Sequence, residues 1–290
     1  MQRDMRAGVG PREPKKRFGQ HFLEPAWVDK VVRAIAPAPD ETFLEIGPGR
    51  GALTRPLAAR AGHVVAFEID RDLARALRDE AIANVTVVEG DFLETTADRL
   101  RAALAEVPAG SRLRVAGNLP YNIASPILFA LVGLHAAGIP LTDATVMLQR
   151  EVADRLAAPP GGKEYGVLTA LIGHRAAAER ILKLPPGAFR PPPRVQSALV
   201  RLTFHAPSPA VRDEAVFHAL VKALFSRRRK TLANALRAYP LPGGLEPGDL
   251  LARTGLDGRR RPETLALAEL ARLADGVAPP LAAPGPGAVL

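Results

Sequence analysis

The segment F-L-E-I-G-P-G-R-G-A-L-T, residues Phe43–Thr54, combines an apolar stretch, a glycine-rich turn and the start of a helical pattern. A strand that leads through glycines into a helix begins a β-α-β unit, from which parallel α/β sheets are built. Gly47, Gly49 and Gly51 let the backbone bend sharply and approach a ligand closely. We therefore expect this turn at the carboxyl edge of a parallel sheet, where such folds bind ligands.

Strands and helices alternate around this segment. Their crossovers should be right-handed, and the sheet mostly parallel with helices on both faces. Residues 175–182 and 197–204 are expected to complete the sheet as a hairpin. The other expected strands are 42–46, 63–67, 85–89, 112–116 and 144–148, and the expected helices are 25–36, 51–61, 71–81 and 123–136.

A composition change at A-P-S-P-A, residues 206–210, predicts a linker. It divides the chain into a flexible basic arm at 1–17, an α/β domain at 18–205, a helical lobe at 211–276 and a disordered tail at 277–290. The tail is rich in Pro, Gly and Ala, which bury too little apolar surface to fold. The helices expected in the lobe are 213–225, 227–239, 248–254 and 262–273.

Composition narrows the function classes. The 290 residues carry 39 Lys+Arg against 30 Asp+Glu, and this net charge of +9 favours a polyanionic partner. The absence of cysteine excludes disulfides, thiolate zinc sites, iron–sulfur clusters and cysteine nucleophiles. The six histidines show no paired metal-ligand spacing, so we expect no metal. No apolar run approaches a membrane span and no signal peptide is evident, which predicts a cytoplasmic protein without membrane partners.

Acidic residues at two further strand ends suggest a nucleoside pocket. Glu68 ends the second strand, where its carboxylate can accept both ribose hydroxyls, and Asp91 follows the third, where it can accept from adenine N6. Together with the glycine turn they describe a bound adenosine, and S-adenosylmethionine fits. The pattern also matches the dinucleotide fingerprint, so an NAD enzyme stays open. Pro48 favours the first reading, because it removes a backbone N–H that a pyrophosphate would need.

The motif G-N-L-P-Y-N-I, residues 117–123, follows the fourth strand and suits an amine substrate. Adenine N6 is a poor nucleophile because its lone pair is delocalised into the ring. The Asn118 side-chain oxygen and a backbone carbonyl near Leu119 or Pro120 could accept its two N–H bonds and favour a pyramidal nitrogen. Tyr121 offers a flat face to the base. Positioning, rather than a strong general base, should supply most of the rate.

Motifs along nearly the whole chain resemble the ribosomal RNA adenine dimethyltransferases of the small subunit. The matching segments are Lys15–Leu23, Glu45–Thr54, Glu68–Leu73, Gly90–Phe92, Asn118–Ile123, Phe189–Leu202 and Phe225–Leu232. The resemblance implies a Rossmann-like class I methyltransferase sheet with a small C-terminal helical domain. It also implies S-adenosylmethionine-dependent dimethylation of N6 on two adjacent adenosines near the 3′ end of 16S rRNA, in a partly assembled small subunit. We expect the enzyme to be a monomer.

The resemblance also assigns residues. It places Phe189 against the target base, opposite Tyr121. Gln196 stands where the family commonly has Asp. The basic run of residues 227–230 is expected to open a helix and grip phosphates. The implied cofactor contacts are His21, Leu23, Gly47, Glu68, Asp91 and Asn118; the catalytic residues are Asn118, Leu119, Pro120, Tyr121 and Phe189; the RNA-binding residues are Arg227, Arg228, Arg229 and Lys230.

Two further alternatives remain open. One is a large-subunit rRNA adenine methyltransferase of the macrolide-resistance type, against which P-P-P-R-V-Q-S and F-S-R-R-R-K argue. The other is a non-catalytic rRNA-binding assembly factor. The presence of Asn118, Tyr121 and Glu68 favours retained chemistry over that role.

Overall fold

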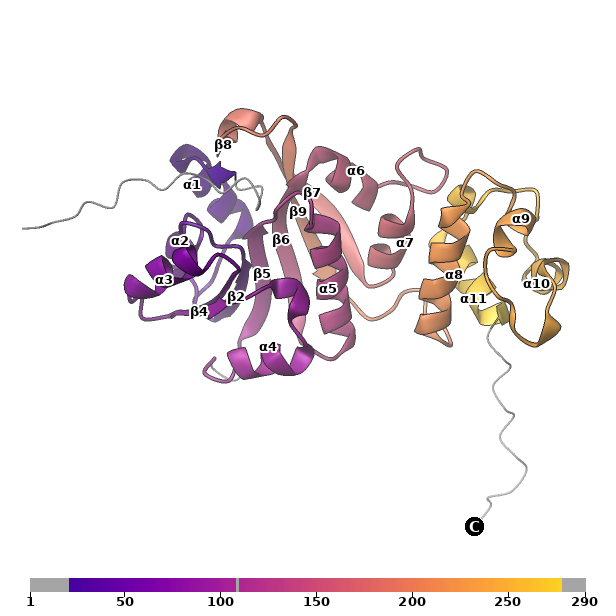
Figure 1. Cartoon of the computed structure of the whole chain (residues 1–290), viewed down its shortest axis with the longest axis horizontal. Coiled ribbons are helices and arrows are strands. Elements are labelled where there is room, and N and C mark those ends of the chain that lie inside the picture. Colours follow the sequence, from indigo (N-terminus) through magenta and orange to yellow (C-terminus); the bar gives the residue numbers. More distant parts are fainter. Residues whose placement is uncertain (1–20, 108–109, 278–290) are drawn as a thin grey trace, which may run out of the picture. The chain divides into compact units, whose positions relative to one another are not determined.

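The computed structural model describes residues 21–107 and 110–277 (Figure 1). The basic arm expected at 1–17, the Lys15–Gln20 part of the first family motif and nearly all of the expected tail lie outside these ranges. The chain divides into two compact units. Unit 1 is Met1–Ile127, Thr145–Gln149 and Ile181–Leu199, and unit 2 is Leu128–Ala144, Arg150–Arg180 and Val200–Leu290. The domain boundaries expected from composition stay a prediction.

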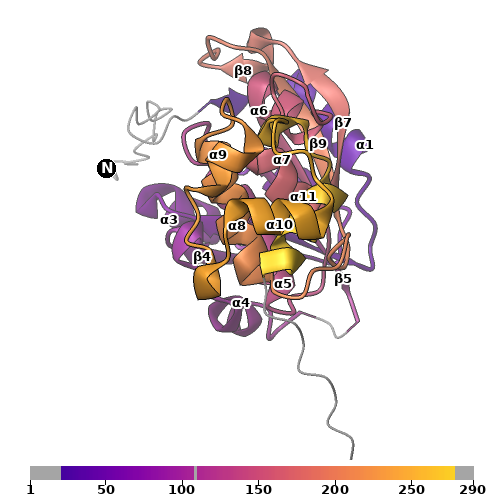
Figure 2. The ribbon, with the colours of Figure 1, turned by 90° about the vertical axis from the view of Figure 1, so that its right-hand side faces the viewer.

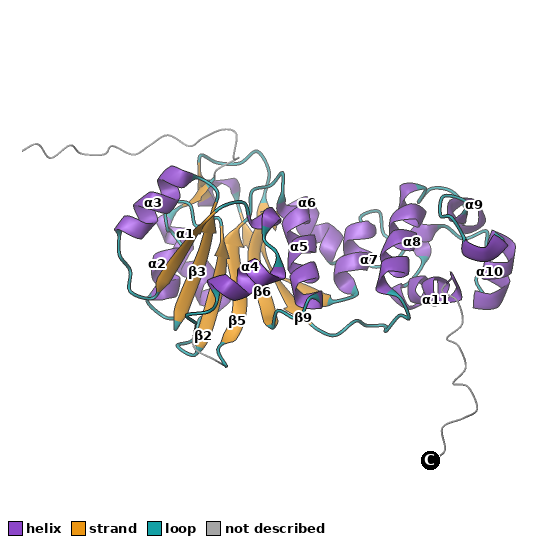
Figure 3. Ribbon diagram, turned by 60° about the horizontal axis from the view of Figure 1, so that its bottom comes forward, coloured by secondary structure: helices purple, strands orange, loops and turns teal. Residues whose placement is uncertain are grey.

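A seven-stranded sheet has the order β4-β3-β2-β5-β6-β9-β7 (Figure 3). β2 pairs in parallel with both β3 and β5, and β3 pairs in parallel with β4. The mostly parallel sheet is thus confirmed. The chain builds outward from β2 through β3 and β4, then returns to the other side of β2 with β5, which makes a topological switch point. The strands are β2 Glu41–Ile46, β3 His63–Glu68, β4 Val85–Glu89, β5 Arg112–Asn118, β6 Leu141–Gln149, β7 Ala176–Leu184 and β9 Ser197–Phe204.

The central strands carry apolar residues on both sides because both faces of the sheet are covered there. All six residues of β2 are buried, and Phe43 and Val64 join a core cluster with Val31 of α1 (Pro25–Ile35) and Leu57 of α2 (Thr54–Ala58). Helix α5, Ala124–Ala136, follows β5 as expected. The helices that lie wholly within unit 1 are α1 Pro25–Ile35, α2 Thr54–Ala58, α3 Arg71–Asp79 and α4 Ala97–Ala103, the last of which the sequence pattern missed.

Helix α2 is shorter than the expected 51–61. Gly47, Gly49 and Gly51 all have positive φ, so the turn continues past them and the helix begins only at Thr54. Phe22 and Leu23 form β1 just before α1, and they pair in a two-stranded antiparallel sheet with β8, Phe189–Arg190. This pairing anchors the chain next to His21.

The helices wholly within unit 2 are α6 Arg150–Leu156, α7 Val167–Gly173, α8 Glu214–Ser226, α9 Leu232–Leu236, α10 Pro247–Thr254 and α11 Leu267–Val277. Helices α8 to α11 lie together (Figure 2), and with α7 they contribute to a second apolar core, which includes Phe217, Leu220, Leu250 and Leu270. The pattern missed α6 and α7. Residues 262–264 form a separate 3₁₀ turn before α11. None of the helices in the described ranges is long and apolar enough to span a membrane.

The helix expected at 227–239 is wrong in its first part. Residues 227–230 form the turn that follows α8, and α9 begins only at Leu232. The backbone N–H of Leu232 donates to Arg260 O (2.6 Å) and that of Ala233 to Gly258 O (3.1 Å). Because these first N–H groups are bound by another segment, the helix cannot continue backwards through the basic run.

Candidate functional site

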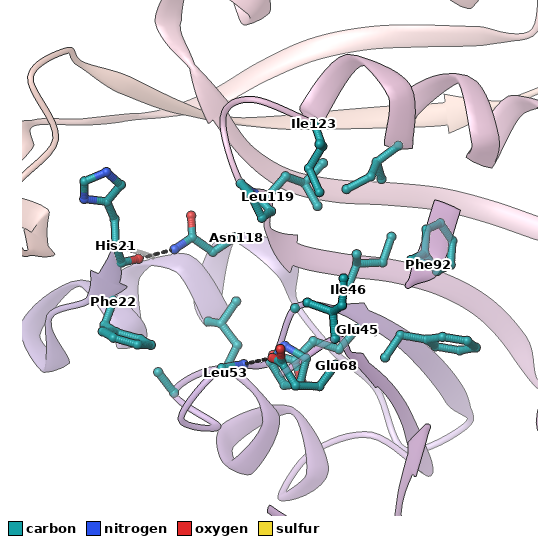
Figure 4. A pocket seen from close by; sticks show the side chains of 18 of the residues that line it. His21, Phe22, Glu45, Ile46, Leu53, Glu68, Phe92, Asn118, Leu119 and Ile123 are labelled. Atoms are coloured by element: carbon teal, nitrogen blue, oxygen red, sulfur yellow. Dashed lines mark hydrogen bonds between the residues drawn. The ribbon is translucent and has the colours of Figure 1, made fainter. Parts of the chain in front are cut away.

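A pocket opens at the carboxyl ends of β2, β3, β4 and β5, beside the switch point (Figure 4). It brings together every predicted cofactor contact and four of the five predicted catalytic residues. Its lining comprises His21, Phe22, Leu23, Glu45, Ile46, Gly47, Pro48, Gly49, Ala52, Leu53, Phe67, Glu68, Ile69, Gly90, Asp91, Phe92, Asn118, Leu119, Pro120, Tyr121, Ile123 and Ile127. All of these residues belong to unit 1.

The glycine turn is fixed from the neighbouring strand. The N–H of Gly47 donates to Phe67 O (2.9 Å), and that of Gly49 donates to Glu68 Oε2 (2.9 Å). Gly47 has φ +69°, and a Cβ built there would meet no described atom within 4 Å. The turn therefore leaves open space in front of its backbone, which is what a bound ligand needs.

Glu68 ends β3 with its side chain only 4% exposed. Its Oε1 accepts from the N–H of Asp70 (2.9 Å), so both carboxylate oxygens are held by backbone donors. Burial raises the pKa of Glu68, and the backbone hydrogen bonds oppose that rise. Each oxygen keeps a further lone pair, so the fixed carboxylate can still accept from a ligand.

Asp91 follows β4 and lies half-buried in the lining. Its Oδ1 accepts from the N–H of Leu93 (2.9 Å), which caps the 3₁₀ turn Phe92–Glu94. The cap fixes the orientation of the carboxylate and leaves Oδ2 as an acceptor for a ligand amine. Phe92 beside it packs edge-on against Phe67, with ring centroids 5.5 Å apart.

Asn118 is the last residue of β5, and its Nδ2 donates to His21 O at 2.6 Å (Figure 4). This bond sets the orientation of the amide, because a carbonyl can only accept. The side-chain oxygen Oδ1 is then the atom available to a substrate amine. His21, which directly precedes β1, thus positions Asn118, the residue that the sequence analysis predicts to orient the target amine.

Tyr121 is held from two sides. Its hydroxyl lies 2.6 Å from Ser197 Oγ, and its ring stacks on His21 with centroids 5.5 Å apart and planes 26° apart. Burial raises the pKa of Tyr121, with the Ser197 hydroxyl opposing the rise. Nδ1 of His21 donates in turn to Pro191 O (2.7 Å). Sequence reasoning missed Ser197, whose contact depends on strand β9 lying near the loop after β5.

Phe189 does not line this pocket within the described residues. Its side chain is 2% exposed and belongs to the apolar core with Leu23 and Leu199. Its backbone pairs with Leu23 in the β1–β8 sheet. Stacking of Phe189 on a base stays a prediction, and it requires the ring to leave this core position.

The basic run of unit 2 is mostly exposed. Arg227, Arg229 and Lys230 project from the turn after α8. Arg228 differs, because its Nη1 donates to Lys163 O (3.1 Å) and Tyr165 O (3.4 Å). Three of the four predicted RNA-binding residues are therefore exposed cations, while the fourth also braces a neighbouring loop.

Glu45 is a pocket residue that the sequence reasoning did not assign. It lies on β2, is 1% exposed, and its Oε2 has no hydrogen-bond partner within the described ranges. Burial raises the pKa of Glu45 to about 7, against the opposing effect of the Thr54 hydroxyl. Ile69 was missed as well; its side chain is 45% exposed beside Glu68 and gives the pocket an apolar surface.

We predict that Glu45→Gln stabilises the ligand-free protein at alkaline pH. Folding raises the Glu45 pKa from its ordinary 4.5 to about 7, so ionisation disfavours the folded state. Below pH 4.5 Glu45 is protonated in both the folded and the unfolded protein, so its ionisation costs no stability. The loss of stability from ionising Glu45 grows between pH 4.5 and 7 and is complete above pH 7. The gain in unfolding free energy at pH 8 should be up to roughly 3 kcal/mol. Urea denaturation at pH 5 and pH 8 measures it, and an equal difference at both would contradict the assignment.

Comparison with known proteins supports one family. The family model for ribosomal RNA adenine dimethylase matches residues 12–246. A ribosomal RNA small subunit methyltransferase A from Verminephrobacter eiseniae is 42% identical, covering 94% of this chain and 96% of the relative. The protein of the same name from Anaeromyxobacter dehalogenans is 46% identical, covering 89% of this chain and 92% of its own.

Solved structures agree with this similarity. A dimethyladenosine transferase from Plasmodium falciparum superposes with a TM-score of 0.69 at 25% identity, covering 87% of this chain and 96% of that one. The 23S rRNA methyltransferase ErmE superposes with a TM-score of 0.61, also at 25% identity, covering 88% and 99%. Both cover nearly the whole chain, so the likeness includes the sheet and the helical part.

Proposed function

Because this chain belongs to the ribosomal RNA adenine dimethylase family, we propose that it dimethylates N6 of two adjacent adenosines near the 3′ end of 16S rRNA, with S-adenosylmethionine as methyl donor. The observation that carries the proposal is the convergence of Glu68, Asp91 and Asn118 on one pocket at the switch point of the sheet. The chain is an rRNA methyltransferase. In this proposal its substrate is a partly assembled small subunit, and it acts on that subunit as a monomer in the cytoplasm.

The pocket residues fit S-adenosylmethionine, which supplies an electrophilic sulfonium methyl group. Glu68 would accept the ribose hydroxyls through its remaining lone pairs, and Asp91 Oδ2 would accept from the adenine amine. The exposed side chain of Ile69 would cover the adenine ring. The buried acidic side chains of Glu45 and Glu68 suit a cationic donor, and the described pocket lining contains no lysine or arginine.

Asn118 and its neighbours would prepare the target amine. With Nδ2 bound to His21 O, Asn118 Oδ1 accepts one N–H of adenine N6, and a carbonyl of Leu119 or Pro120 accepts the other. These two acceptors favour a pyramidal nitrogen aimed at the methyl group. The Tyr121 ring stacks on the base and returns part of the few kcal/mol that base flipping costs, at about 1–3 kcal/mol per stacked base.

We predict that the basic run separates into RNA-binding and structural members. Replacing Arg227 and Arg229 together by Ala should flatten the dependence of log affinity on log salt by about 1.5, because two phosphate contacts are lost. Arg228→Ala should leave that slope unchanged and lower the unfolding free energy by about 1 kcal/mol, because it loses its bonds to Lys163 O and Tyr165 O. Anisotropy titrations with a 16S fragment at several salt concentrations, together with urea denaturation, distinguish the two.

The proposed reaction is tested by incubating purified protein with undermethylated small subunits and labelled S-adenosylmethionine. Primer extension then locates the modified adenines. Label confined to large-subunit RNA would favour the macrolide-resistance type of activity instead. Binding to the small subunit without methyl transfer would favour an assembly factor, and calorimetric binding of NAD in place of S-adenosylmethionine would overturn the cofactor assignment.

A further inference from the structure

Three side chains with metal-ligating atoms meet inside unit 2. They are His174, Glu214 and His218, and one ligand atom from each lies within 4.8 Å of the other two. His174 is the C-cap residue of α7, while Glu214 and His218 lie four residues apart on α8 and so share one face of that helix. Two elements of the same unit therefore direct two imidazoles and a carboxylate to one point.

His174 has the hydrogen bonding of a metal-bound histidine. It is fully buried, and its Nε2 lies 2.9 Å from Pro209 O. Because a carbonyl only accepts, Nε2 carries the proton and Nδ1 keeps its lone pair. Nδ1 is buried and has no hydrogen-bond partner within the described ranges. Ligating histidines usually donate one ring N–H to a carbonyl or carboxylate and bind the metal through the other nitrogen.

His218 adds a second nitrogen without a partner. Its Nε2 is buried and unbonded in the same part of the chain. Two buried imidazole nitrogens left unpaired in one cluster are costly, and a shared cation would satisfy both.

The carboxylate of Glu214 is oriented by Arg175, whose Nε donates to Oε2 (2.9 Å) and whose Nη2 donates to Oε1. Ligating carboxylates are themselves commonly hydrogen-bonded, and each oxygen retains a lone pair for a metal. The guanidinium charge lies near the cluster and lowers its affinity for a dication. It therefore favours a metal that bonds strongly to imidazole over one held by charge alone.

We propose that His174, Glu214 and His218 bind one divalent transition-metal ion, best matched by zinc, at a site that joins α7 to α8. Two imidazoles and one carboxylate suit tetrahedral zinc, with water in the fourth position. A tetrahedral ion with bonds of about 2.0–2.2 Å holds its ligand atoms about 3.3–3.6 Å apart. The three candidate ligand atoms lie within 4.8 Å of one another. Histidine spacing alone did not reveal this set, because one ligand is a glutamate and one imidazole comes from another element.

The test uses the full chain without a polyhistidine tag, stripped of metal with a chelator. Calorimetric titration with zinc sulfate should give one ion per chain, and magnesium chloride should give no binding, because magnesium prefers oxygen ligands. Cobalt(II) should develop the visible absorption of a tetrahedral site without a thiolate band, since the chain has no cysteine. The melting temperature should rise on zinc binding.

The matched variants are His218→Gln and His205→Gln. His218→Gln should weaken zinc binding by at least about 10-fold through the lost ligand. His205→Gln should bind as the wild type does, because His205 is a histidine of unit 2 outside the cluster. Equal zinc binding by both variants would overturn the proposal. Should His218→Gln fail to fold, the wild-type cobalt spectrum decides alone: absence of tetrahedral absorption at stoichiometric cobalt overturns the site.

Discussion

Asn118→Ala is expected to lower the rate of methyl transfer by about 100- to 1,000-fold while leaving the affinity for 16S rRNA nearly unchanged. The substitution removes Oδ1, the acceptor that would orient the target amine, and also the bond from Nδ2 to His21 O. Neither change touches the exposed cations of unit 2 that we propose bind phosphates. Single-turnover methylation of small subunits and anisotropy binding to a 16S fragment measure the two effects separately.

Asn122→Ala is the matched control. Asn122 lies in the same loop, is exposed, and is absent from the pocket lining. Its replacement should leave turnover and RNA affinity unchanged. If Asn118→Ala kept the turnover of this control, the positioning role of Asn118 would be wrong. If both variants lost RNA affinity together, the loop would serve binding rather than chemistry.

The predicted residues that the structure brings to one pocket are those at strand ends. Gly47, Glu68, Asp91 and Asn118 each follow or end a short apolar strand, and parallel pairing brings the carboxyl ends of such strands to one edge. The motif order along the chain was therefore enough to assemble them. The hydrogen-bond partners of these residues could not be predicted from the motifs, because the bond from Asn118 Nδ2 to His21 O joins segments far apart in sequence.

Contacts set by packing could not be predicted in this way. The position of Phe189 is one such contact: its backbone pairs with β1 and its ring lies in the core, while its stacking on a base stays a prediction. Residues 227–230 read as a helix because Arg and Lys have good helix propensity, but the bonds from Leu232 and Ala233 to the 258–260 segment end that possibility. The burial of Glu45 could not be predicted either. Its raised pKa depends on the elements packed around β2, which the local sequence does not show.

Glu68 should show the largest effect on cofactor affinity. Its two oxygens already accept the N–H groups of Gly49 and Asp70, and we propose that their remaining lone pairs accept the ribose hydroxyls. Glu68→Gln replaces one acceptor by an NH₂ group, which must then face a backbone N–H or a ribose hydroxyl. The variant should bind S-adenosylmethionine at least about 100-fold more weakly and lose roughly 1–3 kcal/mol of unfolding free energy.

Glu89 is the matched control for Glu68, because the two residues pair with each other across strands β3 and β4. Glu89 also ends its strand, but it is exposed, lies outside the pocket lining, and pairs with Arg71 and Arg78. Glu89→Gln removes the same charge at a neighbouring strand end, so it should bind the cofactor as the wild type does and change stability by less than about 1 kcal/mol. Calorimetric titration and urea denaturation of both variants compare them directly. Wild-type affinity in both variants would mean that Glu68 does not hold the donor. An equal loss of affinity in both would mean that negative charge near the switch point, rather than the fixed geometry of Glu68, holds it.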